Sequence, residues 1–260
     1  MAASRARAEW VGFSTIIIRE FNRIVRIWGQ TIVPPVVTAT LYFVIFGSLI
    51  GRRVGQVGGY DYMQFIAPGL IMMTVITNSY GNVVSSFFGA KFGKHLEELL
   101  VSPMPNWLIL SGYIAGGMLR GLLVGSVVTV VAFFFTRLEV VHGFAILSAV
   151  LLTSMVFALG GFINALFATN FDQISWFPTF VLAPLTYLGG VFYSTRMLPG
   201  WAQTASEANP ILYMVSAFRY GFLGTSDVDL RLAYGIMAGA VVVMFTTAVV
   251  LLNRGTGIRD

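Results

Sequence analysis

The residues best suited to chemistry lie close together, between Gly89 and Glu98, where the chain reads GAKFGKHLEE. Two glycines followed by a lysine suggest a phosphate-binding loop, in which backbone N–H groups and the lysine hold phosphate oxygens. The spacing departs from that motif, because three residues separate the glycines where the motif has four. His95 also stands where a Ser or Thr would bind magnesium, and no strand-like segment precedes the loop. We therefore expect no nucleotide site in this chain.

Other kinds of reactive site lack their side chains as well. There is no Cys, which excludes disulfides and thiolate metal ligands, and neither His95 nor His142 lies beside a carboxylate pair at metal-ligand spacing. An intramembrane serine protease needs a histidine deep in its helices, and an ion-coupled carrier needs buried relay groups. Only Arg120 and the boundary residue Asp172 are charged within or beside the long apolar runs. We expect no catalytic residue, no metal and no cofactor here.

Residues 91–105 form a charged island between two long apolar runs. Three leucines repeat at the spacing of one helical face, two glutamates fall off that face, and prolines then stop the helix. The leucines are Leu96, Leu99 and Leu100, the glutamates are Glu97 and Glu98, and the prolines are Pro103 and Pro105. The pattern predicts a short amphipathic helix held at a membrane surface, and a solvated loop remains the alternative.

Composition places most of the chain in lipid. The 260 residues are 57% hydrophobic and 10% charged, whereas a soluble domain carries about 25% charged residues. The 16 basic and 11 acidic residues lie in the gaps between apolar runs, which suits anionic lipid head groups better than nucleic acid. A spanning helix needs about 20 apolar residues. We expect six spanning helices, near 32–50, 65–89, 108–134, 144–167, 173–194 and 232–252.

Residues 10–30 precede the first span and form no signal peptide. Apolar residues recur there at steps of three or four, with arginines such as Arg23 between them. These apolar residues are Trp10, Phe13, Ile17, Phe21, Ile24 and Trp28. The pattern predicts a basic amphipathic helix lying in the membrane interface, with a tryptophan at each end. A helix packed on a soluble partner is the alternative.

Two later segments are irregular. The fifth predicted helix contains Pro178, Pro184 and Gly189-Gly190, so we expect a kink or a break. Residues 211–224 are apolar but too short to span, contain Arg219 and follow a turn signal at Asn209-Pro210. We therefore expect a re-entrant or interfacial segment before the last helix.

Orientation follows from the Lys and Arg residues that flank the spans. Nine of them share a side with the N-terminus and six lie on the other. We expect both termini in the cytoplasm together with residues 91–105, and residues 52–60 and 196–226 on the far side. No repeat or linker divides the chain, so 1–260 is expected to be one domain.

The third predicted helix carries both a charged residue and a row of glycines on one face. A charge at the centre of a span costs about 2.5–3.5 kcal/mol, so Arg120 should face protein or water. Gly117, Gly121 and Gly125 recur every four residues and allow another helix to approach closely. That helix belongs either to the same chain or to a second subunit.

Four groups of residues together resemble the membrane subunit of ABC-2 type exporters, over nearly the whole chain. They are Glu97-Glu98-Leu99-Leu100 with Pro103; Pro184 to Tyr193, reading PLTYLGGVFY; Leu198-Pro199 with Trp201; and Asn209-Pro210 with Tyr213, Ala217 to Tyr220 and Gly224. The similarity is greatest to the small bacterial inner-membrane permeases and to the nodulation and daunorubicin-export branches. The polysaccharide-exporting branch is more distant.

The resemblance implies an all-α polytopic membrane protein of the bacterial inner membrane, which pairs as a homodimer and binds two copies of a separate cytoplasmic ATPase. ATP and magnesium would then bind to that partner. In the family, the helix after the second span docks into the ATPase, and that role transfers to Lys94, His95, Glu97, Glu98, Leu99, Leu100 and Pro103. The interfacial helix would also touch the ATPase. The re-entrant pair matches Leu198 to Gly224, and includes Asn209, Pro210, Tyr213 and Arg219.

The resemblance further implies a translocation path between two protomers, lined partly by the first and fifth helices. Those helices offer Tyr42, Phe46, Phe180, Pro184, Tyr187 and Phe192. Aromatic rings suit lipid-like or ring-bearing cargo, although they also simply pack in lipid. The function we expect is ATP-driven export of a drug, a lipid or a lipid-linked glycan. The membrane subunit of an importer and a non-transporting membrane anchor remain alternatives.

Overall fold

The computed structural model describes residues 2–96, 99, 102 and 104–257. The helices and strands are α1 (Ala2–Arg26), α2 (Trp28–Tyr42), the π-helical η1 (Phe43–Ile50), α3 (Gly51–Val54), β1 (Gln56–Val57), β2 (Tyr60–Asp61), α4 (Tyr62–Phe92), α6 (Asn106–Phe135), α7 (Gly143–Phe167), α8 (Phe171–Phe177), the π-helical η2 (Pro178–Leu182), α9 (Ala183–Tyr187), the 3₁₀ turn η3 (Thr195–Met197), α10 (Gly200–Glu207), α11 (Pro210–Leu223) and α12 (Leu230–Arg254).

Local sequence signals fix several helix ends. Asp61, Asn170, Asn209 and Asp229 each precede a helix and accept a hydrogen bond from a backbone N–H of its first turn. Such caps satisfy donors that the helix itself leaves unpaired. At the other end of α12, Gly255 adopts a left-handed φ of 68° and stops the helix.

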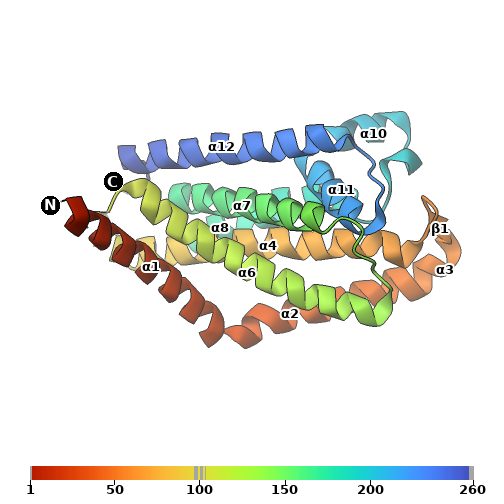
Figure 1. Cartoon of the computed structure of the whole chain (residues 1–260), viewed down its shortest axis with the longest axis horizontal. Helices are drawn as coiled ribbons and strands as arrows, with labels where there is room; N and C mark the ends of the chain where they lie inside the picture. The colour runs from red at the N-terminus through yellow and green to blue at the C-terminus, as the bar shows by residue number, and fades with distance from the viewer. Residues whose placement is uncertain (1, 97–98, 100–101, 103, 258–260) are drawn as a thin grey trace.

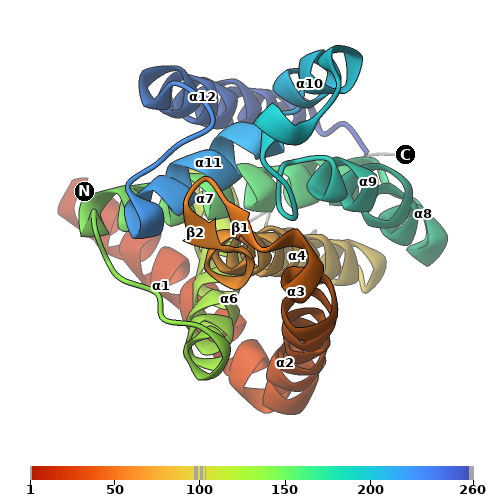
Figure 2. The ribbon, with the colours of Figure 1, turned by 90° about the vertical axis from the view of Figure 1, so that its right-hand side faces the viewer.

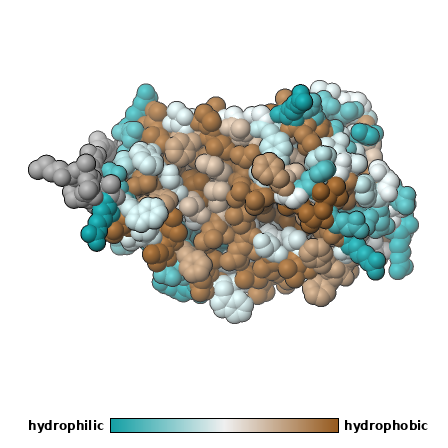
Figure 3. Space-filling model, in the orientation of Figure 1, coloured by the Kyte–Doolittle hydropathy of each residue, from teal (hydrophilic) through white to brown (hydrophobic). Residues whose placement is uncertain are grey.

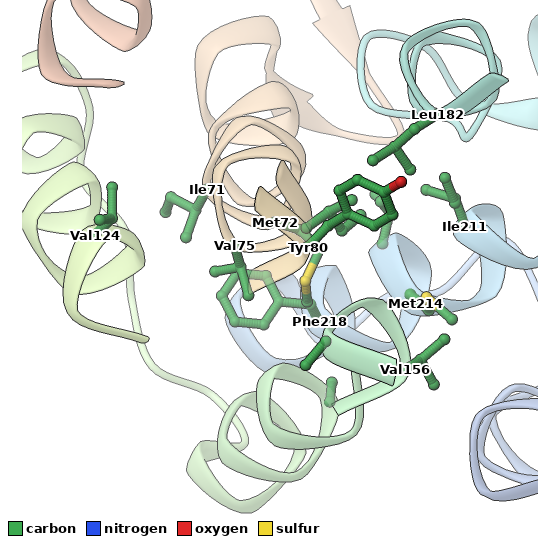
Figure 4. Close-up of a cluster of buried hydrophobic side chains, with 14 of the residues drawn as sticks. Ile71, Met72, Val75, Tyr80, Val124, Val156, Leu182, Ile211, Met214 and Phe218 are labelled. Carbon is green, nitrogen blue, oxygen red and sulfur yellow. The ribbon is translucent and has the colours of Figure 1, made fainter. Parts of the chain in front are cut away.

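The core lies around α4, which runs through the middle of the bundle (Figure 1). Its side chains meet those of α7 and α11 in an apolar cluster, where Met72, Val75 and Tyr80 lie close to Val156 and Phe218 (Figure 4). All five of these side chains are buried. The predicted second span is therefore the central packing element of the fold.

Glycines on α6 allow close packing within the chain. A Cβ atom added at Gly117 would lie 2.4 Å from Val83, and one added at Gly121 would lie 3.2 Å from the Ser79 Cβ of the same helix, α4. Gly125 meets Val75, also on α4. Of the two partners that the glycine stripe allowed, the helix of the same chain is confirmed.

Four helical segments of the described chain are long and apolar enough to cross a membrane, namely Trp28–Val54, Asn106–Phe135, Gly143–Phe167 and Leu230–Arg254. They coincide with the first, third, fourth and sixth predicted spans. The first is interrupted by Pro34 and Pro35 within α2 and by the π-helical η1. The second predicted span is α4, which has 31 residues and therefore runs roughly 46 Å.

The fifth predicted helix is broken, as its prolines and glycines indicated. It consists of α8, η2 and α9, with the π-helical turn beginning at Pro178. It ends at Tyr187 rather than near residue 194, because the chain turns at Gly190, where φ is +72°. Its helical part, 171–187, is about 25 Å long at 1.5 Å per residue.

Both termini lie at one end of the bundle, and the β1–β2 hairpin, α3 and α10 lie at the other (Figures 1 and 2). In the view of Figure 3, apolar residues cover the middle of the molecule and hydrophilic residues gather towards its two ends. Val242 and Val243, halfway along α12, are among the large exposed apolar side chains. An apolar belt between polar ends is the surface expected of a protein that spans a bilayer.

Candidate functional site

The N-terminal helix α1 docks on the bundle through a buried carboxylate. Glu20 is 0% exposed, and its Oε2 lies 3.0 Å from Arg23 Nη2 and 3.2 Å from Asn82 Nδ2 of α4. Its other oxygen accepts a hydrogen bond from Ser86 Oγ and lies 3.6 Å from Arg19 Nη2. A buried charge is stable only when it is paired and hydrogen-bonded, and Glu20 is both.

Arg23 extends this network along α4. Its guanidinium donates to the Asn82 side-chain oxygen at 2.7 Å, to the Asn82 backbone carbonyl at 3.0 Å and to Ser85 Oγ at 3.2 Å. Burial works to lower the pKa of Arg19, but its interactions with Tyr113 and Glu20 together raise it. Arg19 therefore keeps its positive charge beside the carboxylate.

Two glycines of α6 bring α1 into this position. A Cβ added at Gly112 would lie 2.8 Å from Ile16, and one added at Gly116 would lie 2.7 Å from Glu20. The face of α1 that contacts protein is thus Ile16, Glu20 and Ile24. Of the predicted membrane-facing stripe, Ile24 is buried, Trp10, Phe21 and Trp28 are exposed, and Phe13 and Ile17 are half-buried. The placement of this stripe in the membrane interface remains a prediction, and the helix ends at Arg26, before Trp28. Sequence reasoning missed Glu20, although an acid among arginines four residues from Ile16 and Ile24 was a usable signal.

A cavity of about 650 Å³ opens beside the Glu20 network. Its lining joins α1, the last turns of α4 and the segment that follows α4. The lining residues are Arg19, Glu20, Arg23, Ser85, Ser86, Gly89, Ala90, His95 and Leu99. The cavity lies towards the end of the bundle that carries both termini, because α4 ends there (Figure 1).

Part of the predicted coupling segment can be placed. Leu96 is buried, Leu99 is half-buried, and Lys94 and His95 are exposed. Lys94 has a left-handed φ of 59°, which is uncommon for a residue other than glycine and turns the chain away from α4. Glu97, Glu98, Leu100 and Pro103 lie outside the described residues. Their role in coupling remains a prediction.

Lys91 has a structural partner near the same place. Its Nζ lies 2.8 Å from the Leu166 carbonyl and 2.7 Å from the Ala168 carbonyl, at the C-terminal end of α7. A cation there satisfies carbonyls left free by the helix and opposes the negative end of its dipole. Lys91 therefore ties the end of α4 to the end of α7.

Arg120 lies on α6, half-buried, one helical turn beyond Gly116. Ile16 meets Gly112 and Glu20 meets Gly116, so α1 and α6 run in the same direction and Arg120 lies level with Ile24. Its Nε is buried and, among the described residues, has no hydrogen-bond partner. The expectation that Arg120 faces protein is met in part, and its functional role remains a prediction.

The predicted pathway residues separate into two groups. Tyr42, Phe46, Tyr187 and Phe192 come together, with the Phe46 and Phe192 ring centroids 4.5 Å apart and the two tyrosine hydroxyl oxygens 3.0 Å apart. Phe180 is 65% exposed and contacts Trp176 instead. Pro184 is exposed on α9. The first and fifth predicted helices therefore meet through four of the six residues.

A second cavity, of about 370 Å³, lies beside this aromatic cluster, between α2, α4 and α9. Sequence reasoning missed its polar wall, which consists of Thr38, Thr74, Thr77 and Asn78. The missed signal was the spacing of the last three, which places them on one face of the second span.

The predicted re-entrant residues hold the opposite end together. Arg219 is 2% exposed, and donates to the Gly190 carbonyl at 2.6 Å and to the Phe65 carbonyl at 3.2 Å. It also pairs with Asp227 at 3.5 Å and lies 3.9 Å from the centre of the Phe65 ring. Arg219 thus joins α11, α4 and the loops before η3 and α12.

The remaining re-entrant residues order the α10–α11 corner. Asn209 caps α11 and donates to the Leu185 carbonyl at 2.6 Å. Pro210 occupies the first position of that helix, and the Tyr213 hydroxyl donates to the Glu207 carbonyl at 2.8 Å. Asn209, Tyr213 and Arg219 of this predicted segment therefore have structural partners, whereas the buried Ser216 hydroxyl has none among the described residues.

The chain is similar in sequence to known membrane proteins of one family. The family described as "ABC-2 type transporter" matches residues 11–223. The chain is 52% identical to the "Inner membrane transport permease YadH" of Escherichia coli (strain K12) over 251 residues, which cover 96% of this chain and 98% of the relative. It is 26% identical to "Nodulation protein J" of Rhizobium leguminosarum bv. trifolii, over 82% of each chain. The chain therefore belongs to the ABC-2 type transporter family, as a multi-pass inner-membrane permease subunit that has an ATP-binding cassette partner.

Proposed function

We propose that this chain exports a hydrophobic or amphiphilic molecule across the inner membrane, driven by ATP hydrolysis on a separate subunit. The observation that carries the proposal is the junction of α1, the end of α4 and the segment after it. The Glu20 network joins α1 to Asn82 and Ser86 of α4, in the part of that helix that precedes its end at Phe92 and the proposed coupling segment. A push on that segment would therefore reach two helices at once, which is the arrangement a coupling device requires.

The proposed membrane topology has six spans. The helices α2 with η1, α4, α6, α7 and α12 are each long enough for a hydrocarbon core of about 30 Å. The broken helix of α8, η2 and α9 would form the fifth, and α10 with α11 the re-entrant pair. The charge bias favours the cytoplasm for the end that carries both termini. Residues 94–103 would then face the ATPase. ATP and magnesium would bind on that partner and not on this chain.

We further propose that two copies of the chain assemble with two copies of the ATPase. A two-fold pair would place two aromatic clusters and two Thr-lined cavities on facing surfaces, with a path for the cargo between them. Phe180 and Trp176, exposed on the broken helix, would then contact lipid or the second copy.

Transport is favoured over a non-transporting anchor because the relatives include a transport permease. Export is proposed over import because the cavity at the α1–α4 junction lies at the proposed cytoplasmic end, where an exported cargo would enter. Co-expression of the chain with candidate ABC ATPases from the same genome tests the assembly. Native mass measurement should give two copies of each protein, and amphiphiles should stimulate ATP hydrolysis in proteoliposomes. A chain that purifies without any ATPase, or hydrolysis that no amphiphile changes, would count against the proposal.

A further inference from the structure

The open face of α4 is polar along much of its length. Between Met73 and Ala90 half of the residues of this helix are buried, and the open positions fall on one side. Apart from Met73, these positions carry small or polar residues: Thr74, Thr77, Asn78, Gly81, Ser85, Ser86, Gly89 and Ala90. Their spacing of three and four residues makes a continuous stripe along one face, which we call the α4 stripe.

The α4 stripe connects the two cavities already described. Thr74, Thr77 and Asn78 line the cavity between α2, α4 and α9, and Ser85, Ser86 and Gly89 line the cavity at the α1–α4 junction. Gly81 lies between the two groups, and a Cβ added there would meet nothing within 4 Å. The stripe is therefore open at Gly81, between the two cavities. At the proposed cytoplasmic end, Ser85 and Ser86 are hydrogen-bonded to Arg23 and Glu20 of α1, so that network flanks the stripe there.

Polar side chains in the middle of a membrane-spanning helix need polar surroundings. Thr77 and Asn78 are near the midpoint of a helix that runs roughly 46 Å, so their surroundings would otherwise be hydrocarbon. Exposed polar groups in hydrocarbon are costly, whereas such groups beside water or a polar ligand are not. The stripe accordingly calls for water, a second protein or a ligand with its own hydrogen-bonding groups.

The hydrogen bonds of the stripe show what kind of ligand would fit. The Thr74 and Thr77 hydroxyls donate to the carbonyls of Leu70 and Met73, and Asn78 Nδ2 donates to Thr74. Their oxygens are left as acceptors, and no described residue donates to Asn78 Oδ1. The lining of this cavity, within the described chain, includes no charged side chain. Such a lining suits hydroxyl donors, and it lacks the Arg or Lys that a phosphate or carboxylate would need.

The other walls of the cavity are mainly apolar, apart from Thr38 and the mutually hydrogen-bonded hydroxyls of Tyr42 and Tyr187. Pro34, Pro35 and Ala39 line it from α2, and Leu70 and Met73 from α4. A molecule with an uncharged, hydroxyl-bearing head and an alkyl chain would meet acceptors on one side and apolar surface on the other.

We propose that the α4 stripe binds the uncharged, hydroxyl-bearing head group of an amphiphilic cargo and guides it from the α1–α4 junction to the middle of the membrane. This proposal rests on the export function proposed above and names the chemical class of its cargo. In this proposal Thr77 and Asn78 select the head group of the cargo, and the open space at Gly81 lets that head group pass along α4.

Single cysteines test the proposal directly, because the native chain has none. The assembled complex is reconstituted with Thr77→Cys, Asn78→Cys or Gly81→Cys, and labelled with a water-soluble thiol reagent. Thr246→Cys on α12 is the matched control, since Thr246 is exposed and its hydroxyl also donates to its own helix, at 2.8 Å from the Val242 carbonyl. The three stripe cysteines should be labelled, and the control cysteine should not.

Two probes with the same alkyl chain then separate the head groups. An alkyl maltoside should slow labelling of the stripe cysteines at least fivefold, and the matching alkyl phosphate should leave the rate unchanged. In the cysteine-free complex, Thr77→Val with Asn78→Leu should raise the half-maximal maltoside concentration for ATPase stimulation about tenfold. That is the scale of losing one or two neutral hydrogen bonds. Thr246→Val should not change it.

The possible failures are distinguishable. Equal protection by both probes, or no protection by the maltoside, would overturn the head-group assignment while leaving export intact. Stripe cysteines that resist labelling and cross-link to the same position of a second copy would show a protein interface in place of a cargo surface. Failure of the chain to assemble with an ATPase would overturn the proposed function itself.

Discussion

At the scale of single residues, Glu20 and Arg219 hold opposite ends of the bundle. Each is a buried charge that joins segments distant in the chain: Glu20 joins α1 to α4, and Arg219 joins α11 to α4 and to the Gly190 turn. Removing one partner of a buried pair leaves the other charge uncompensated, which costs more than the pair contributes. Both residues therefore make sharp predictions about stability.

Glu20→Ala should destabilise the protein by an amount near the lower end of the roughly 3–5 kcal/mol typical of broken buried pairs, because Arg23 is partly exposed. Glu20→Gln should cost less, since an amide can still bond to Ser86 and Asn82. The apparent melting temperature in detergent measures this order. Glu139→Ala, at an exposed acid in the loop before α7, is the control. A melting temperature for Glu20→Ala equal to the control would contradict the buried network.

Arg219→Lys should destabilise the protein even though it keeps the charge. A lysine presents a single ammonium, which cannot reproduce a guanidinium fork that bonds Gly190, Phe65 and Asp227 together. Arg196→Lys, at an exposed arginine of the same end, should leave the melting temperature unchanged. Equal behaviour of the two lysine variants would show that the fork geometry is unimportant.

At the scale of elements, the sequence predicted the kind of local structure, such as a helix, a turn or an irregular helix, better than it predicted which elements pack against each other. The irregularities at Pro178 and Gly190, the turn at Asn209-Pro210 and the glycine face of α6 were readable because each acts through the local backbone. The face of α1 that contacts the bundle was not readable, because the hydrophobic spacing predicted only a membrane-facing stripe from Trp10 to Trp28 and gave no weight to a buried acid. The Thr77–Asn78 surface was missed for a similar reason: a polar face in a predicted span counted only as weaker hydropathy.

The segment after α4 provides the main test of an element. Exposed single charge pairs contribute only about 0–1 kcal/mol, so neutralising one glutamate should have little effect. Glu97→Lys with Glu98→Lys should still insert and dimerise but lose amphiphile-stimulated ATP hydrolysis, because like charges would face each other in the ATPase groove. Glu139→Lys with Glu207→Lys makes the same charge change at the opposite end. Normal stimulation in the first double variant would exclude a coupling role for these carboxylates.

At the scale of the whole molecule, the ends of the bundle should lie on opposite sides of the membrane. Both termini share one end, and the hairpin of β1 and β2 marks the other (Figure 1). With the termini in the cytoplasm, an impermeant thiol reagent should label Gln56→Cys in intact cells and Ser4→Cys only after permeabilisation. Labelling of Ser4→Cys from outside would reverse the orientation. Gln56 is exposed in the hairpin, so the expected label has access.

The sequence was enough to predict the overall fold class but not the proposed cargo-binding surface on α4. Long apolar runs and the resemblance to one family were enough for a helical membrane bundle, because lipid demands such runs wherever a chain spans it. The α4 stripe depends on which face of α4 its neighbours leave open. That choice is made by α6 and α7 packing at Gly121 and Gly161, so it emerges only from the assembled fold.

The central claim is that ATP hydrolysis on a partner subunit moves cargo through this chain and out of the cytoplasm. It is tested most directly by the direction of transport in proteoliposomes that hold the complete complex. ATP supplied only to complexes whose ATPase faces outward should drive a fluorescent alkyl maltoside into the vesicle interior, in proportion to ATP hydrolysed. Glu97→Lys with Glu98→Lys should abolish that flux. Accumulation in the opposite direction, or hydrolysis without any ATP-dependent movement across a panel of amphiphiles, would contradict the account.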